Sequence, residues 1–480
     1  MKPNQQSPVV SLVSLGCAKN TVDSERILGR LVESGFLLSE DPAQADICLV
    51  NTCGFIHDAR EESAATLREL AKLRHGGQLK ALVALGCLAE RALDMPEVAS
   101  TLAPADATIR FADYPRLAEI CRELIAQRNA ADEVGRPHCG RRGARSASAL
   151  PQGGDYHQTF QNFPRLRIGA AHTAYLKISE GCSNPCRFCA IPRIRGKQVS
   201  RPIADIVREA RELISIGARE LCLIAQDTTS YGRDLAGKFL LPDLLTTLRD
   251  EISDAVWFRL MYAYPLHLTD AVLGALASDK RFCPYLDLPL QHISDAMLAA
   301  MGRGMTKAET LALLDHLPQK LPSLALRTSF IVGYPGETKQ DFEELLAFVR
   351  EGRFTHAGVF LYSHEAKTPA AKLDDNLPLE VKQARRDTLM TAQLEVSRRR
   401  QATRVGQKIY VLVDEPVKRG ARVPKGVHAI ARSQYEAPEV DGAVLLSGPV
   451  AARHDPGTFA NVKIVKGLDY DVIAEVATRD

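Results

Sequence analysis

The chain has 480 residues, of which 45% are hydrophobic and 25% are charged, and its formal net charge is +3. This length predicts about three domains, and the weak net charge decides neither for nor against a nucleic-acid partner. Eleven cysteines in so long a chain do not form the pattern of a small secreted disulfide framework. No apolar stretch approaches the roughly 18–20 residues that a membrane span needs, so we expect a cytoplasmic enzyme without membrane contact.

The N-terminal third, residues 8–125, contains three apolar runs that each stop at a cysteine. VVSLVSLGC ends at Cys17, ADICLVNTC at Cys53 and KALVALGC at Cys87, with helical patterns between them. This alternation predicts parallel strands in βαβ units, whose carboxyl ends share one edge of the sheet. Each cysteine could instead be a small buried residue that fills a gap. Because all three stand at the same strand-end position, we interpret them as ligands of a 4Fe–4S cluster with one open iron.

Residues 126–165 differ in composition from the segments on either side. They include HCGRRGARSASALPQGGD, which is rich in Gly, Ser, Pro and Arg and has no periodicity. Such a stretch predicts a linker or a mobile surface loop.

The stretch EGCSNPCRFCAIP holds three further cysteines, Cys182, Cys186 and Cys189, in the spacing C-x3-C-x2-C. Thiolates select zinc or iron–sulfur clusters. A structural zinc site usually closes with a fourth Cys or His, and none follows nearby. A 4Fe–4S cube with three local ligands keeps one iron open. The motif resembles that of the radical S-adenosyl-L-methionine (SAM) enzymes, in which the open iron chelates the methionine part of SAM.

Residues 166–398 repeat a strand–helix unit six times. This predicts an α/β fold with an open, partial (β/α)6 barrel that has its chemistry at the carboxyl ends of the strands. The predicted strands are 174–179, 220–226, 257–264, 285–291, 325–333 and 356–363.

Several residues near the predicted strand ends are candidates for contacts with SAM. Gly333 and Gly336, in SFIVGYPGET, permit close backbone approach to a ligand, although a plain tight turn explains them equally well. The polar candidates, each of which could instead be a rim residue, are Asp227, Glu337, His292 and Glu365. The chemistry that the resemblance to radical SAM enzymes implies needs no side chain as a general base, so we predict no catalytic residue beyond the cluster ligands.

The C-terminal part, residues 400–470, follows a long charged helix and consists of short alternating runs separated by Gly, Pro and Asp turns. It predicts a five-stranded barrel of the OB type. Such barrels often bind RNA or other polymers. Between Arg404 and Asp469, however, ten Lys and Arg stand against seven Asp and Glu, which is no strong basic stripe.

This order of regions resembles the methylthiotransferase family, which has an N-terminal cluster domain, a radical SAM core and a TRAM domain. The sequence motifs around the cysteines resemble those of the RimO-type branch of that family. The tRNA-modifying branches carry Gln-Met-Asn after the first cysteine, where this chain has Ala-Lys-Asn. The matching motifs are LGCAKNTVDSE, NTCGFI, AYLKISEGC, IPRIRGKQVSR and LPLQHISDAMLAAMGRG.

The resemblance implies a transferase that inserts a methylthio group at the β-carbon of an aspartate in the twelfth protein of the small ribosomal subunit. It also implies two 4Fe–4S clusters and SAM as cofactors. The partners would be that ribosomal protein, or the subunit carrying it, and an electron donor such as flavodoxin. A tRNA adenosine methylthiotransferase is the alternative, and a non-catalytic metal-binding RNA or ribosome module is a rival of another class. The open-iron spacing and the six-unit barrel argue against that module.

Overall fold

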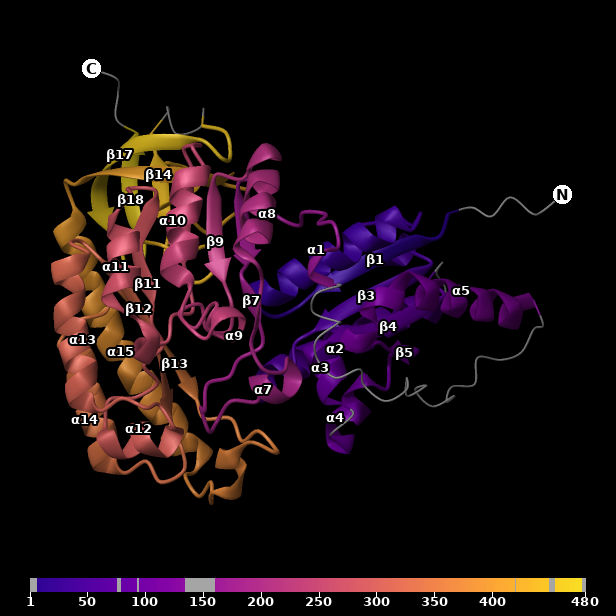
Figure 1. Ribbon diagram of the computed structural model, residues 1–480, viewed down its shortest axis with the longest axis horizontal. Helices are drawn as coiled ribbons and strands as arrows, with labels where there is room; N and C mark the ends of the chain where they lie inside the picture. The colour runs from indigo at the N-terminus through magenta and orange to yellow at the C-terminus, as the bar shows by residue number, and fades with distance from the viewer. Residues whose placement is uncertain are drawn as a thin grey trace. The chain divides into compact units, whose positions relative to one another are not determined.

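The computed structural model describes residues 7–75, 79–92, 95–133, 160–418, 420–448 and 454–476 (Figure 1). The chain forms two compact units, and short segments after residue 179 alternate between them. The first unit comprises Met1–Ile168, Glu180–Cys182 and Ala190–Val199. The second unit comprises Gly169–Ser179, Ser183–Cys189 and Ser200–Asp480.

The first unit is built around a five-stranded parallel sheet, as the alternation of apolar runs and helices predicts. The strands, in spatial order, are β2 (Leu37–Leu38), β1 (Val9–Ser14), β3 (Ile47–Thr52), β4 (Ala81–Gly86) and β5 (Ala107–Thr108). Every residue of β3 and β4 is buried, which is expected of central parallel strands that are covered on both faces. Among the described residues its α-helices are α1 (Ala18–Glu33), α2 (His57–Lys72), α3 (Cys87–Arg91), α4 (Pro96–Ala99), α5 (Leu117–Glu133) and α7 (Ile191–Ile194).

The segment predicted as a linker is ordered at both of its described ends. Helix α5 runs on to Glu133, so residues 126–133 are helical. At the other end Phe160 packs edge-on against Tyr114, with 5.0 Å between the ring centroids. Both rings are buried, and this burial holds the end of the segment on the first unit. Residues 134–159 lie outside the described residues.

The second unit contains a six-stranded parallel sheet, which confirms the partial (β/α)6 barrel. Its strands, in spatial order, are β13 (His356–Leu361), β12 (Ala325–Val332), β11 (Phe282–Asp287), β10 (Trp257–Leu260), β9 (Glu220–Ile224) and β6 (Thr173–Lys177). Strand β11 ends four residues before the predicted end. Pro289 lies among these four residues, and a proline has no backbone N–H to donate to a neighbouring strand.

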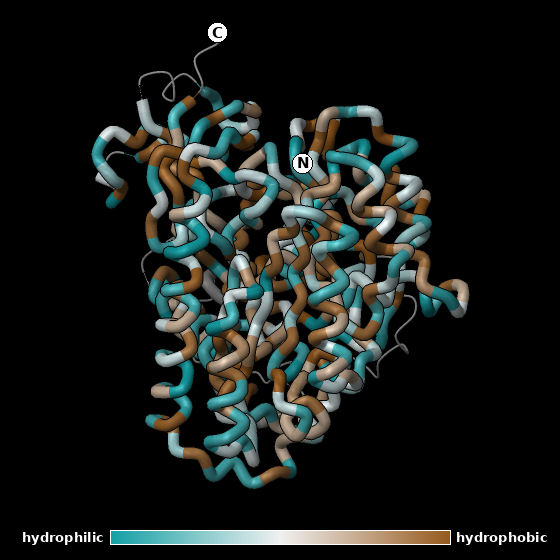
Figure 2. Tube along the Cα trace, turned by 90° about the vertical axis from the view of Figure 1, so that its left-hand side faces the viewer, coloured by the Kyte–Doolittle hydropathy of each residue, from teal (hydrophilic) through white to brown (hydrophobic). Residues whose placement is uncertain are grey.

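The helices of this unit cover one face of the sheet with their apolar side. The covering helices are α8 (Ile203–Ser215), α10 (Leu241–Glu251), α11 (Asp270–Ala277), α13 (Lys307–Lys320), α14 (Lys339–Arg350) and α15 (Leu379–Arg404). Two shorter helices, α9 (Arg233–Ala236) and α12 (Asp295–Met301), also belong to this unit. Hydrophobic and hydrophilic segments alternate along helical turns in Figure 2, as expected of helices with one buried face. Among the described residues, no helix combines the length and apolar character needed to cross a membrane.

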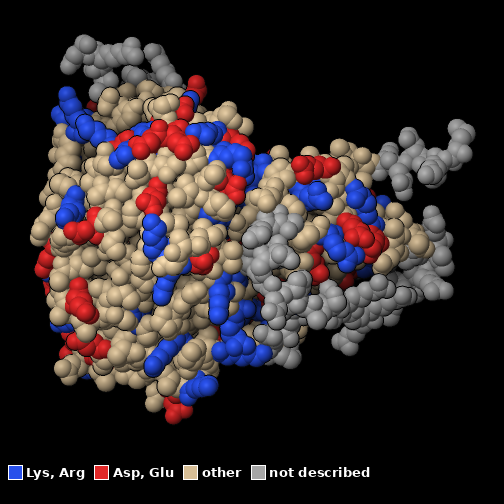
Figure 3. Space-filling view, viewed as in Figure 1, with Lys and Arg blue, Asp and Glu red and all other residues tan. Residues whose placement is uncertain are grey.

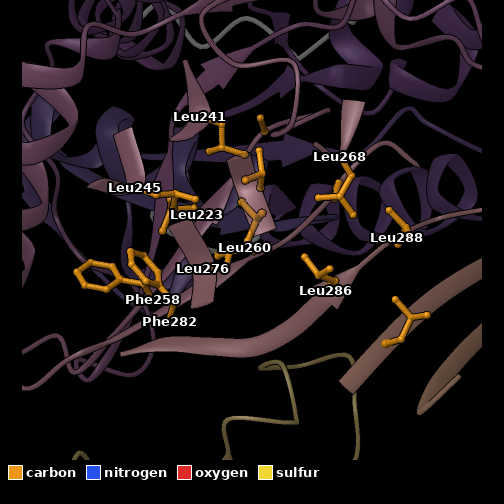
Figure 4. Packing of buried hydrophobic residues seen from close by; sticks show 14 of the residues in the cluster. Leu223, Leu241, Leu245, Phe258, Leu260, Leu268, Leu276, Phe282, Leu286 and Leu288 are labelled. Atoms are coloured by element: carbon orange, nitrogen blue, oxygen red, sulfur yellow. The ribbon is translucent and has the colours of Figure 1, made fainter. Parts of the chain in front are cut away.

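The core of the second unit lies between this sheet and its helices. Alternate strand residues such as Leu223, Leu260 and Leu286 point to the helices, and the rings of Phe258 and Phe282 lie 5.3 Å apart (Figure 4). Burying each such side chain contributes about 1.5–3 kcal/mol relative to leaving it exposed. This packing fixes the strands and therefore the position of the loops at their carboxyl ends.

The C-terminal segment forms a closed five-stranded barrel within the second unit, as predicted. Around the barrel its strands are β14 (Lys408–Pro416), β15 (Val427–Ser433), β16 (Val444–Ser447), β18 (Val472–Val476) and β17 (Phe459–Gly467). A cluster of alternate apolar residues, including Val411, Ala431 and Val462, fills the inside.

The barrel lies at the amino ends of the sheet strands (Figure 1), and buried ion pairs join the two. Glu220, the first residue of β9, accepts from Arg259 Nε at 2.7 Å and from Arg432 Nη1 of β15 at 2.5 Å. Arg432 also donates to Asp414 of β14 at 2.8 Å. Burial alone would raise the pKa of Glu220, but the two arginines hold that pKa below its ordinary value. The barrel therefore supplies, through Arg432, a positive charge that pairs with the buried Glu220 carboxylate of the sheet.

Replacing Arg432 with Met should lower the free energy of unfolding by about 3–5 kcal/mol, because it removes one partner from a buried ion-pair network. Urea unfolding of the full chain measures this. Arg422→Met, at an exposed position of the same barrel, is the matched control and should leave stability almost unchanged. Equal midpoints for the two variants would show that the network contributes nothing.

Candidate metal centre and cofactor site

Three cysteines of the first unit stand at the carboxyl ends of neighbouring parallel strands. Cys17 follows β1 and caps helix α1, Cys53 follows β3, and Cys87 follows β4 and opens helix α3. A Cβ atom placed on Gly16 would lie 3.1 Å from Cys53 Sγ, and the Cys87 thiol interacts electrostatically with the other two. The predicted convergence of the three cysteines is confirmed. Their role as cluster ligands stays a prediction.

The three thiols are donors of the kind that zinc and iron–sulfur clusters select. The described residues include no group of three or more His, Cys, Asp or Glu side chains arranged to hold one metal ion. Ligands of one zinc ion must all come within about 2.0–2.3 Å of it. In a 4Fe–4S cube each thiolate binds a different iron, so the three sulfurs stand farther apart. Three cysteines match the number of protein ligands of a cube that keeps one iron open.

Arg195, which sequence reasoning missed, contacts this cysteine edge from the segment after the second cysteine motif. Its Nε lies 3.3 Å from Cys87 Sγ. Its two Nη atoms donate to Asn20 at 2.6 Å, to Asp23 at 2.9 Å, and to both carboxylate oxygens of Glu180 at 2.9 and 3.0 Å. All five residues belong to the first unit. The sequence offered one signal for this residue, the position of Arg195 in the motif IPRIRGK. Sequence periodicity, however, cannot reveal which distant residues an arginine contacts.

Burial and charge compete at this contact. Burial raises the pKa of the Cys87 thiol to about 12, although Arg195 lowers it. Burial also opposes the charged form of Arg195, yet Cys87, Glu180 and Asp23 raise its pKa well above the ordinary value. The guanidinium therefore stays charged beside the sulfur. A bound metal deprotonates a coordinating thiol outright, so the apo thiol's high pKa does not prevent ligation.

Gly86 makes the position of Cys87 possible. Its backbone has φ +90° and ψ −158°, a region that essentially only glycine occupies. A Cβ atom here would lie 2.2 Å from Asn51 Oδ1 and 2.7 Å from the Thr52 carbonyl oxygen. The turn from β4 into α3 therefore depends on glycine.

Gly86→Ala should displace Cys87 and lower the free energy of unfolding. Backbone strain alone costs about 1–3 kcal/mol, and the loss should be larger because the added methyl group overlaps neighbouring atoms. Gly35→Ala is the control, since Gly35 has φ +83° but open space around an added Cβ. Urea unfolding and the iron content after reconstitution measure the effect. Equal losses for both variants would contradict the packing argument.

The second cysteine motif lies in the loop that follows β6 and the short strand β7 (Ser179–Glu180). Cys182 belongs to the first unit, and Cys186 and Cys189 belong to the second. Within the second unit, Arg303 Nη1 lies 3.3 Å from Cys186 Sγ, a contact that the sequence did not predict. The loop stands at the carboxyl end of β6, where the barrel fold predicts the chemistry.

Asp227, at the carboxyl end of β9, is tied to that loop. It accepts from Asn184 Nδ2 at 2.8 Å and from Thr229 Oγ1 at 2.6 Å, and His267 Nδ1 lies 3.1 Å away. Burial would raise the pKa of Asp227, but the hydrogen bonds from His267, Thr229 and Asn184 keep that pKa below its usual value. Glu365, in the loop after β13, is buried and is hydrogen-bonded within its own loop. Contacts of either residue with SAM stay predictions.

The remaining SAM candidates include a buried group at the carboxyl end of β12. The Gly333 N–H donates to Glu337 Oε2, and Arg385 Nη1 lies 3.1 Å from the same oxygen. Glu337 Oε1 and His292 Nε2 stand 3.7 Å apart, and neither has a hydrogen-bond partner among the described residues. Gly336, at φ +86°, faces open space. The structure thus brings Gly333, Glu337 and His292 together and leaves two polar atoms for a ligand or water.

Comparison with known families accounts for most of the chain. Residues 176–349 match the Radical SAM superfamily, residues 9–106 match the uncharacterized protein family UPF0004, and residues 405–477 match the TRAM domain. Among solved structures, the chain is similar to the radical S-adenosylmethionine methyltransferase TsrM from Kitasatospora setae. The TM-score is 0.52 at 16% identity, over 87% of this chain and 80% of that one, which supports the fold.

Curated relatives match almost from end to end. The ribosomal protein uS12 methylthiotransferase RimO of Anaeromyxobacter sp. (strain K) is 42% identical over 98% of this chain and 94% of its own length. The protein of the same name from Geobacter sulfurreducens is 40% identical over 97% of this chain and 98% of its own. The fold and the cysteine loop are those of a radical SAM enzyme, a class that implies a 4Fe–4S cluster and SAM. Within that class, the chain belongs to the RimO family of ribosomal protein uS12 methylthiotransferases.

Proposed function

We propose that this protein inserts a methylthio group at the β-carbon of an aspartate in ribosomal protein uS12, the twelfth protein of the small subunit. The observation that carries this proposal is the 40–42% identity to uS12 methylthiotransferases over nearly the whole chain. The convergence of Cys17, Cys53 and Cys87 supports it, because the N-terminal unit then offers a second place for a cluster.

Two 4Fe–4S clusters and SAM are the proposed cofactors. One triplet, Cys17, Cys53 and Cys87, holds a cluster on the first unit, and the other, Cys182, Cys186 and Cys189, holds the cluster that binds SAM. Bound in this way, the cofactors supply one-electron cleavage of SAM, hydrogen abstraction, sulfur and the methyl group. The side chains ligate, orient and exclude water, and none needs to act as an acid or base.

The proposed SAM contacts are Asp227, Gly333, Gly336 and Glu337. Gly336 has no neighbour that an added Cβ would meet, so its backbone is accessible to a ligand. Glu337 offers a buried oxygen without a protein hydrogen bond. Asp227 holds Asn184 of the cysteine loop and so orients that loop as well.

The proposed partners are uS12, or the ribosomal subunit that carries it, and an electron donor such as flavodoxin. The work would take place in the cytoplasm, where ribosomes are. Transfer RNA is not the proposed substrate. Acidic and basic side chains lie side by side on the face drawn in Figure 3, and such mixed charge offers less attraction to an RNA backbone than a continuous basic stripe.

Anaerobic reconstitution should give about eight irons per chain, the content of two 4Fe–4S cubes. Replacing Cys17, Cys53 and Cys87 with Ala should leave about four, and so should replacing Cys182, Cys186 and Cys189. The first of these variants should still convert SAM to 5′-deoxyadenosine, because the SAM-binding cluster keeps its own ligands. It should attach no methylthio group.

Cys48→Ala serves as the control, since Cys48 is buried within β3 and should change no iron count. Tight zinc binding without iron uptake would refute the cluster assignment. Wild-type methylthiolation by the Cys17/Cys53/Cys87 variant would refute the role of the first triplet.

Reconstituted enzyme incubated with SAM, a reductant and uS12 should add about 46 Da to one aspartate-containing peptide, because SCH3 replaces H. Mass spectrometry of the peptides measures this. Binding of naked tRNA should be weak and should fall steeply as salt rises. The same mass increase on a tRNA adenosine, without modification of uS12, would assign the protein to the tRNA-modifying branch.

A further inference from the structure

The guanidinium of Arg195 lies between the two cysteine motifs. It contacts Cys87 Sγ on one side and holds the Glu180 carboxylate, two residues before Cys182, on the other. We propose that Arg195 is a positioning residue that orients the Cys87 thiolate and raises the reduction potential of the cluster on the first unit. This inference rests on the proposed cluster at Cys17, Cys53 and Cys87.

The contacts of Arg195 leave the side chain little freedom. It is 4% exposed, and its Nε and both Nη atoms have partners, Nη2 donating to Asn20 and Asp23. The planar guanidinium fork fixes several acceptors at once, which the single ammonium of lysine cannot reproduce. The ring of Phe111 lies 5.2 Å away and covers the group. The N–H that faces the sulfur is thus held in place before any cluster binds.

Asn20 strengthens the arrangement from the cysteine edge itself. Its Oδ1 accepts from Arg195 and lies 3.6 Å from Cys87 Sγ. Its Nδ2 donates to the carbonyls of Leu15 at 2.8 Å and Thr52 at 3.2 Å. Asn20, fixed on helix α1, therefore accepts a hydrogen bond that orients Arg195, and the Nε of Arg195 faces the Cys87 sulfur.

The backbone next to Arg195 contacts the segment that leads into the second motif. Cys182 N–H donates to the Gly196 carbonyl at 3.1 Å, directly after Arg195 in the chain. A Cβ atom on Gly181 would lie 2.2 Å from the Lys197 carbonyl oxygen, so the two backbone segments are in close contact. The side chain of Arg195 thus contacts Cys87 of the first triplet, and the backbone of the next residue, Gly196, accepts from Cys182 of the second.

The expected sign follows from charge. Reduction adds an electron to the cluster, and hydrogen bonds to its sulfurs help to set the potential. A positive N–H donor beside the thiolate stabilises the more negative, reduced state, and burial strengthens the interaction. Removing it should therefore lower the reduction potential.

The test uses the full chain carrying Cys182→Ala, Cys186→Ala and Cys189→Ala, so that only the cluster of the first unit remains. Redox titration followed by electron paramagnetic resonance compares this parent with the same chain carrying Arg195→Lys. At a fixed solution potential, the ratio of reduced to oxidised cluster should fall at least tenfold, which corresponds to about 59 mV for one electron. Arg193→Lys, exposed on helix α7 (Ile191–Ile194), is the matched control and should not change the ratio.

Each outcome decides a different point. A parent without iron–sulfur absorption would overturn the proposed cluster, and this inference with it. An Arg195→Lys chain with the parent's iron content and an unchanged potential would overturn this inference and leave the proposed function standing. If Arg195→Lys takes up no iron, Asn20→Ala decides, because it leaves every charge in place and removes one of the acceptors that hold the guanidinium. A lowered potential in that variant supports the inference, and an unchanged potential overturns it.

Discussion

Parallel pairing of strands is the constraint on which both units depend. In a parallel sheet all strands end at the same edge, so residues that are distant in sequence but follow a strand are brought together. This pairing gathers Cys17, Cys53 and Cys87 on the first unit. On the second unit it places Asp227 and the Gly333–Glu337 turn at the carboxyl ends of β9 and β12, the same end of the sheet at which the cysteine loop follows β6.

Buried arginines complete the framework that the strands begin. Arg195 faces a thiol and two carboxylates in the first unit, and Arg259 with Arg432 faces Glu220 in the second. A buried charge is tolerated only when it is paired and hydrogen-bonded. The C-terminal barrel is therefore more than an attached recognition module, because deleting it would leave Glu220 with only one of its two arginines. A point substitution on the barrel surface is the cleaner way to separate recognition from stability.

The assignment of two short segments around the second cysteine motif to the first unit follows from the same contacts. Glu180–Cys182 and Ala190–Val199 belong to the first unit although they flank a loop of the second. Arg195 and Glu180 account for this, since both are bound to residues of the N-terminal sheet and its first helix or to each other.

The sequence by itself determined the strands, the parallel sheets, the closed barrel and the six cysteine positions. These follow from local apolar runs, turn residues and spacing, which a single chain displays directly. Tertiary structure decided that Phe160 packs against Tyr114, which is distant in the sequence, and it shows that residues 126–133 of the predicted linker belong to helix α5. It also decided the partners of Arg195, Arg303 and Arg432. A long, flexible side chain can pair with any acceptor within its reach, and only the folded backbone determines which acceptor that is.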